Sequence, residues 1–145
     1  DKPVFTRARM LPPSKVSGVT LNNAVLADGC IIHADKIERS IVGIRSRIGA
    51  GTVMKSTYMM GADFYEKLDE LIEMYSKQQP PPIVVGERCY IQHAILDKNC
   101  RIGNDVRIKG SPALPDGDFE THTIRDGIVV VKKNAIIANG VTIGC

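Results

Sequence analysis

The sequence predicts an all-β fold in which short strands wind around one apolar interior, with a single helical insertion. Two observations lead to this prediction. Aliphatic residues recur about every six positions along most of the chain. Aromatic residues make up only 5% of the 145 residues, and there is no Trp. Apolar mass carried by Ile, Val, Leu and Ala suits thin layers of short strands better than a bulky core.

Each repeating unit opens with an aliphatic residue and often has a small residue four places later. The units begin at Leu26, Ile32, Val42, Ile48, Met54, Val85, Ile91, Leu96, Ile102, Ile108, Val131, Ile137 and Ile143. A fixed short period is typical of a coil in which equivalent positions stack on one another. We therefore expect the first position to form an interior ladder. The fifth position, often Cys, Ser, Thr, Ala or Val, should fill the inside of the corners.

The bends between units contain glycines where the backbone needs a positive φ, as at Gly29, Gly51 and Gly140. This combination resembles the hexapeptide-repeat family of left-handed parallel β-helices. The resemblance implies three faces per coil and makes the predicted class an all-β, left-handed parallel β-helix with a helical insertion.

Two segments interrupt the repeat. Residues 61–82 carry apolar residues at helical spacing and end in Gln-Gln-Pro-Pro-Pro, which predicts a short amphipathic helix followed by a rigid loop. Residues 109–123 are rich in Gly, Pro and Asp and predict an extruded loop. Each insertion alone is more simply a solvated excursion than a binding element.

Charge and cysteine usage exclude several classes of function. A formal net charge of +3 without a basic cluster does not indicate nucleic-acid binding. None of the four cysteines forms a C-x-x-C pair, and Cys30, Cys89 and Cys100 fall at the inward fifth position, so we expect no metal site. With no signal peptide and no run of about 18 apolar residues, we expect an intracellular chain, and its opening looks like the middle of a longer protein.

No catalytic residue is predicted. His33 and His93 occupy outward positions of the repeat, neither has a nucleophile nearby in the pattern, and His122 belongs to no recognisable motif. The carboxylates of the helical insertion are more simply a solvated face.

The distinctive feature is cationic. Lys98 and Lys133 share the third position of their units, so they lie over one another if they fall on the same edge of the coil. Two ammonium groups held close together become useful when an anion bridges them. Arg7 and Arg9 in the entry segment are candidates to join them. By spacing alone, ordinary solvated charge is the simpler interpretation.

Four stretches resemble a more specific family. They are FTRARMLPPSK at 5–15, SIVGIRSRIGAGTVMKSTYMMGADFYE at 40–66, AILDKNCRIG at 94–103 and DGIVVVKKNAII at 126–137. They are similar to the linker and the C-terminal domain of the glucose-1-phosphate adenylyltransferase (ADP-glucose pyrophosphorylase) family. The resemblance implies that residues 1–18 are a linker from an N-terminal nucleotidyltransferase domain. Residues 19–145 would then be the regulatory and oligomerisation domain.

The same resemblance implies a function. Enzymes of that family make ADP-glucose from ATP and glucose 1-phosphate for glycogen or starch synthesis, and anionic metabolites regulate them. It places an effector anion at Lys98, Lys133, Asp97 and Arg9, with no catalytic and no metal residue in this domain. Mg²⁺ and ATP belong to the catalytic domain, so a chain without that domain is expected to be inactive. Lys132 adds a charge that many relatives lack.

The resemblance also implies partners and a compartment. The partners are the N-terminal catalytic domain of the same polypeptide, other subunits of a homo- or hetero-oligomer such as a homotetramer, and a sugar-phosphate effector, with neither nucleic acid nor membrane. The compartment is the bacterial cytoplasm or the plastid stroma. Two alternatives stay open: a hexapeptide acyltransferase that uses acetyl-CoA and a histidine base, and a purely structural module for self-association.

Overall fold

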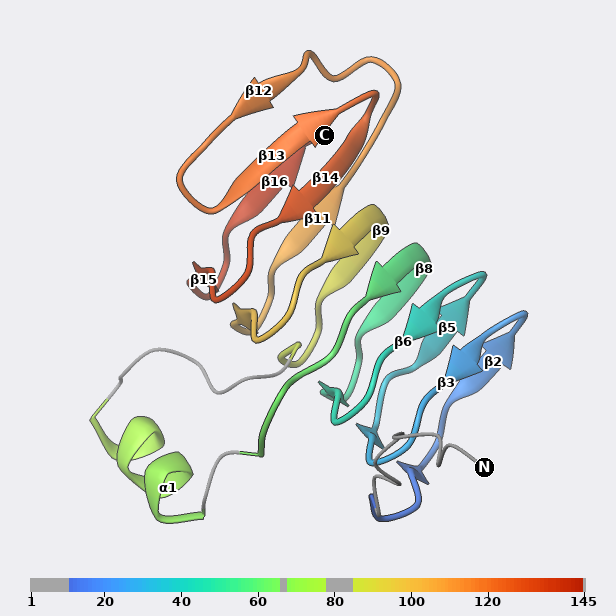
Figure 1. Cartoon of the computed structure of the whole chain (residues 1–145), viewed down its shortest axis with the longest axis vertical. Helices are drawn as coiled ribbons and strands as arrows, with labels where there is room; N and C mark the ends of the chain where they lie inside the picture. Colours follow the sequence, from blue (N-terminus) through green and yellow to red (C-terminus); the bar gives the residue numbers. More distant parts are fainter. Residues whose placement is uncertain (1–10, 66–67, 78–84, 145) are drawn as a thin grey trace, which may run out of the picture.

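Short parallel strands stack in register to build three flat faces, here named A, B and C, around one interior (Figure 1). The computed structural model describes residues 11–65, 68–77 and 85–144. Face A contains β1 (Lys15–Val16), β4 (Ile31–Ile32), β7 (Arg47–Ile48), β10 (Arg101–Ile102) and β15 (Ile136–Ile137), with Val85 bridging Ile48 and Ile102.

The other two faces share the long strands β8 and β9, which bend from one face to the next. Face B contains β2 (Thr20–Asn22), β5 (Lys36–Glu38), the first parts of β8 (Val53–Met59) and β9 (Tyr90–Leu96), β11 (Arg107–Lys109) and β16 (Thr142–Gly144). Face C contains β3 (Val25–Leu26), β6 (Ile41–Val42), the second parts of β8 and β9, and β14 (Ile128–Val131).

The interior is the predicted aliphatic ladder. The predicted first positions are buried, except Leu26 at the N-terminal end of the stack, which is partly buried. Burying one such side chain contributes about 1.5–3 kcal/mol, so the ladder is the main source of stability. Some steps are shorter than six: Met59 and Leu96 lie five places after Met54 and Ile91, where face B turns into face C.

Most of the small fifth-position residues are buried as predicted, whereas Ala135 and Val141 near the C-terminal end are only partly buried. Several of the buried ones donate hydrogen bonds to corner carbonyls. Ser46 Oγ donates to Gly43 O at 2.7 Å and Thr52 Oγ1 to Gly86 O at 2.7 Å. Cys100 Sγ donates to Asp97 O at 2.8 Å. A small donor at this position therefore fills a tight corner and also satisfies a backbone group that the turn would leave unpaired.

Burial also makes the cysteine thiols poor acids. Desolvation raises the pKa of Cys30, Cys89 and Cys100, and that of Cys100 to about 12. All three are free and buried, which confirms their predicted inward placement; Cys145 lies outside the described residues.

The raised thiol pKa predicts alkaline lability. Above about pH 9 the unfolded chain loses the Cys100 proton while the folded chain keeps it, so stability falls as pH rises toward 12. We expect Cys100→Ala, which copies Ala135 in the next coil, to reduce this fall by up to about 1.4 kcal/mol per pH unit. Urea denaturation from pH 8 to 10.5 measures it. Equal slopes in both proteins would contradict the prediction.

The predicted helical insertion is confirmed in its central part. Helix α1 (Leu68–Ser76) projects to one side of the stack in Figure 1. Asp69 and Glu70 lie in its first turn, where their negative charges interact favourably with the positive end of the helix dipole. Residues 61–65 precede the helix as an irregular segment with a bend rather than belonging to it. The side chains of Leu68, Leu71 and Tyr75 and the predicted loop at 78–82 lie outside the described residues.

The prediction of an extruded loop at 109–123 is partly wrong. The segment contains β12 (Gly117–Asp118), and β13 (His122–Arg125) pairs antiparallel with both β12 and β14. The hairpin turns at Asp126 and Gly127, whose φ values are 52° and 79°. An Asp-Gly pair favours this two-residue turn, which adds β13 and β12 beyond β14 at the C-terminal end of face C (Figure 1).

The first rung of the coil begins earlier than predicted. Strand β1 pairs in parallel with β4, so Lys15 and Val16 belong to face A although they fall within the predicted linker 1–18. Residues 1–10 of that stretch lie outside the described residues, and the origin of the linker stays a prediction.

Candidate functional site

The candidate site lies along the corner where face C turns into face A, here called the lysine corner. Backbone hydrogen bonds connect successive levels of this corner: Arg45 N to Asp28 O at 3.2 Å, Ala62 N to Ile44 O at 3.0 Å, Asn99 N to Gly61 O at 3.1 Å and Asn134 N to Lys98 O at 3.0 Å. Asp28, Ile44, Gly61, Lys98 and Lys133 therefore occupy the same place on successive levels. The predicted stacking of Lys98 and Lys133 on one edge is confirmed.

A left-handed residue follows each of these lysines and turns the chain into the next face. Asn99 and Asn134 have φ values of 62° and 61°, and Asn tolerates this region better than most residues with a side chain. Arg45 has a φ of 56° at the equivalent place in an earlier coil. The local geometry that positions Lys98 and Lys133 is therefore set by the Lys-Asn pair in each unit.

Lys98 pairs with an acidic residue from another part of the chain. Its Nζ lies 3.0 Å from Asp63 Oδ1, and Asn99 Nδ2 donates to Asp63 Oδ2 at 3.1 Å. In return, the Asp63 backbone N donates to Asn99 Oδ1 at 2.9 Å. These two side-chain bonds, with the more distant charge of Lys133, lower the pKa of Asp63 below its ordinary value.

Asp97 has a structural part in this corner. Its Oδ1 accepts a hydrogen bond from the Lys98 backbone N at 2.6 Å, and its backbone carbonyl accepts one from Cys100 Sγ. The carboxylate thus braces the turn that presents Lys98.

The two adjacent lysines at the next level differ in their surroundings. Lys132 Nζ lies 2.7 Å from Asp118 Oδ1 and donates to the Phe119 carbonyl, which ties it to the hairpin. Lys133 is exposed, and within the described part of the chain it has no ion pair shorter than 4.0 Å. Of the two lysines, Lys132 is the one held by the described residues around it.

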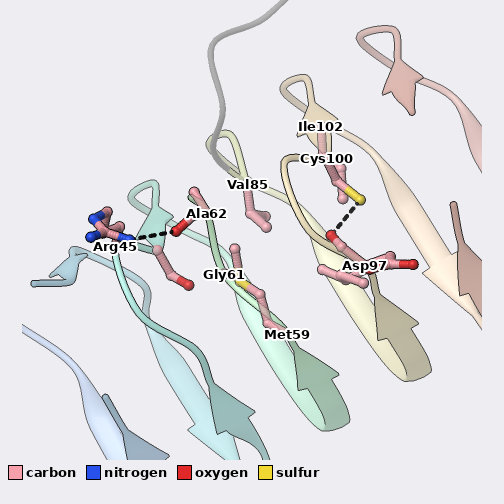
Figure 2. Close-up of a pocket in the computed structure, with 10 residues that line it drawn as sticks. Arg45, Met59, Gly61, Ala62, Val85, Asp97, Cys100 and Ile102 are labelled. Carbon is pink, nitrogen blue, oxygen red and sulfur yellow. Dashed lines mark hydrogen bonds between the residues drawn. The ribbon is translucent and has the colours of Figure 1, made fainter. Parts of the chain in front are cut away.

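A small pocket opens into the coil beside the lysine corner. It forms where the chain leaves the coil after Met59 and re-enters at Val85 (Figure 2). Figure 2 shows Gly61 and Ala62 on one side and Cys100 and Ile102 on the other. Arg45 Nη1 donates to the Ala62 carbonyl at 3.2 Å and fastens the departing segment to the coil.

Other kinds of site have little support in the described residues. His33 and His93 are exposed as predicted, and His122 stacks on Phe119 in the hairpin with ring centroids 4.6 Å apart. Residues 11–65, 68–77 and 85–144 contain no cluster of three potential metal ligands. In the same ranges, no helix is long and apolar enough to cross a membrane.

Comparison with protein families connects this geometry to a known class. The model of the GLGC left-handed parallel β-helix domain matches residues 9–142. The chain belongs to this family.

Membership of the GLGC domain family confirms the predicted handedness of the coil and the resemblance seen in the four stretches. The chain is a β-helix domain of the glucose-1-phosphate adenylyltransferase type. The match includes Asp97, Lys98 and Lys133 and begins at Arg9. Arg9 lies outside the described residues, so its approach to the two lysines stays a prediction, as does Arg7.

One residue of the GLGC-type corner escaped sequence reasoning. Asp63 belongs to the quoted Gly-Ala-Asp motif, but nothing in the repeat predicts that it reaches a lysine 35 places later. The available signal was the motif itself, which directly follows the last strand before the helical insertion.

Proposed function

We propose that this chain is the regulatory and oligomerisation domain of a glucose-1-phosphate adenylyltransferase, an enzyme that makes ADP-glucose from ATP and glucose 1-phosphate for glycogen or starch synthesis. Lys98 and Lys133, with Arg9 from the linker, hold an anionic effector such as a sugar phosphate. The observation that carries this proposal is the stacking of two lysines at successive levels of one corner, with Lys133 exposed.

The electrostatics of the corner favour a phosphate group. Adjacent ammonium groups repel each other when empty, and a dianion between them removes the repulsion and gains charge-assisted hydrogen bonds. Each lysine stands on a turn fixed by backbone hydrogen bonds and a left-handed Asn, so the backbone that presents it needs no ordering on binding.

The effector acts by favouring one packing of this domain on the catalytic domain of the same polypeptide. Mg²⁺ and ATP bind in the catalytic domain, and this domain alone is inactive. Coupling free energies of about 1–3 kcal/mol are usual for such regulation. The enzyme works in the bacterial cytoplasm or the plastid stroma.

The oligomerisation part of the proposal is supported by an apolar column outside face C. Val25, Ile41 and Tyr58 stand in register on β3, β6 and β8, with 60%, 43% and 43% of their surface exposed. Adjacent exposed apolar side chains of this kind are typical of contact surfaces between subunits or domains.

Charge removal in the full-length enzyme tests the regulatory role. We expect Lys98→Ala and Lys133→Ala each to raise the effector concentration for half-maximal response at least about fivefold, because each deletes a direct contact to the anion. Lys132→Ala is the matched control, since Lys132 is engaged by Asp118 and Phe119. Activity as a function of effector concentration gives the answer. An unchanged response in both lysine variants would refute the site.

A further inference from the structure

We propose that Asp63 is an internal counter-ion of Lys98, which an incoming anion must displace. The inference rests on the proposed anion site at the lysine corner and adds a competitor built into the chain itself. It follows from where the Asp63 carboxylate lies and what holds it there.

The Asp63 carboxylate makes the contacts that a bound anion would make. One oxygen lies 3.0 Å from Lys98 Nζ, and the other accepts a hydrogen bond from Asn99 Nδ2 at 3.1 Å. Lys133, one level along the corner, is close enough to stabilise the same negative charge. The carboxylate therefore takes up the positive potential that an external phosphate would otherwise meet.

The backbone delivers Asp63 to this place. Gly61 occupies the level of the corner directly before Lys98, and Ala62 is buried and bonded to Ile44 O and Arg45 Nη1. With its own backbone N bonded to Asn99 Oδ1, Asp63 starts the excursion from a fixed point. The Asp63 carboxylate, which competes with an incoming anion for Lys98, is consequently always present at high local concentration.

The ion pair is nevertheless easy to break. The side chains of Lys98 and Asp63 are 41% and 45% exposed, and exposed pairs of this kind are weak. A dianion that contacts both Lys98 and Lys133 gains more interaction energy than is lost when the Asp63 carboxylate leaves Lys98. A monoanion only replaces one single charge by another and gains little. The arrangement thus selects phosphate-bearing dianions over carboxylates or chloride.

Displacement also alters the attachment of the excursion. Besides its backbone bonds to the coil, the segment from Gly61 to Tyr65 is held by side-chain contacts at three places: Ala62 O to Arg45, the Asp63 carboxylate to Lys98 and Asn99, and Tyr65 Oη to Gly29 O at 2.9 Å. Anion binding removes the middle side-chain contacts, those of the Asp63 carboxylate. Occupancy of the corner is thereby transmitted to the segment that leads to α1.

Sulfate titration of the 145-residue protein, followed by NMR at the backbone amides of Lys98, Asn99 and Asn134, tests the inference. We expect Asp63→Asn to bind sulfate about two- to fivefold more tightly than the wild type, the range that corresponds to loss of an exposed ion pair. The gain should vanish in the background of Lys98→Ala, because the counter-ion acts through that lysine.

Asp105→Asn is the matched control. Asp105 pairs with Arg88 at 2.8 Å on another corner, so its replacement makes the same change in net charge without touching Lys98. Circular dichroism verifies that each variant keeps the coil, and Asp63→Ser provides a second variant if Asp63→Asn does not fold.

The possible outcomes separate the two proposals. Equal sulfate affinities for Asp63→Asn and Asp105→Asn, or weaker binding by Asp63→Asn, overturn the counter-ion while Lys98-dependent binding upholds the anion site. Sulfate binding that does not weaken in Lys98→Ala, or no response at the corner in any variant, overturns the site and the inference together.

Discussion

Replacement of Ile102 by alanine is expected to lower the free energy of unfolding by about 2–5 kcal/mol. Ile102 is fully buried on face A, between Val85 on one side and Ile137 on the other. It also lines the pocket beside the lysine corner, so the deleted atoms enlarge an existing space in a coil that cannot collapse along its stacking direction. Urea denaturation followed by circular dichroism measures the loss.

Ile136→Ala is the matched control for this variant. Ile136 stands on β15, beside the residue that stacks on Ile102, but it points outward and is 46% exposed. The same change of residue type should cost at most about 0.5 kcal/mol there. Similar losses at the two sites would show that the interior ladder does not dominate stability.

Replacement of Gly61 by alanine is expected to be the most damaging change at the lysine corner. Gly61 has a φ of 94°, and a Cβ there would lie 2.3 Å from the Ile44 carbonyl oxygen. That oxygen accepts the bond from Ala62 N, so relief of the clash separates the departing segment from the coil. The left-handed backbone costs about 1–2 kcal/mol for a residue with a side chain, and the overlap adds about 1–3 kcal/mol.

Gly140→Ala separates these two contributions. Gly140 has a φ of 75°, but nothing lies within 4 Å of the position that a Cβ would take. It should therefore show the backbone cost alone, and the difference between the variants in urea denaturation measures the clash. Equal losses of unfolding free energy in the two variants would show that the segment at Gly61 moves aside without a measurable cost.

Repetition made the coil predictable. The residues that stack, such as Ile48, Ile91 and Ile102, are all of one kind and recur at a near-constant spacing, so composition and period alone place them inside. Gly29, Gly51 and Gly140 have the positive φ expected of them. The lysine pair followed from the same logic, because equivalent positions of a parallel coil must lie above one another.

Non-glycine corners were not predictable in the same way. Arg39, Arg45 and Arg88 also adopt positive φ, although arginine has no preference for it. The stacked coils force these residues into a conformation that each would avoid alone, because its cost is small beside the burial of the neighbouring ladder residues.

The sequence by itself determined the fold class, the interior ladder, the inward cysteines and the shared level of Lys98 and Lys133. These features depend on periodicity, and the same pattern recurs in every repeating unit. Only the tertiary structure decided that Asp63 pairs with Lys98, that Lys132 is tied to Asp118 while Lys133 is exposed, and that the second insertion folds into a hairpin. Each of these involves a segment that does not repeat, and its geometry depends on how the chain leaves and re-enters the coil.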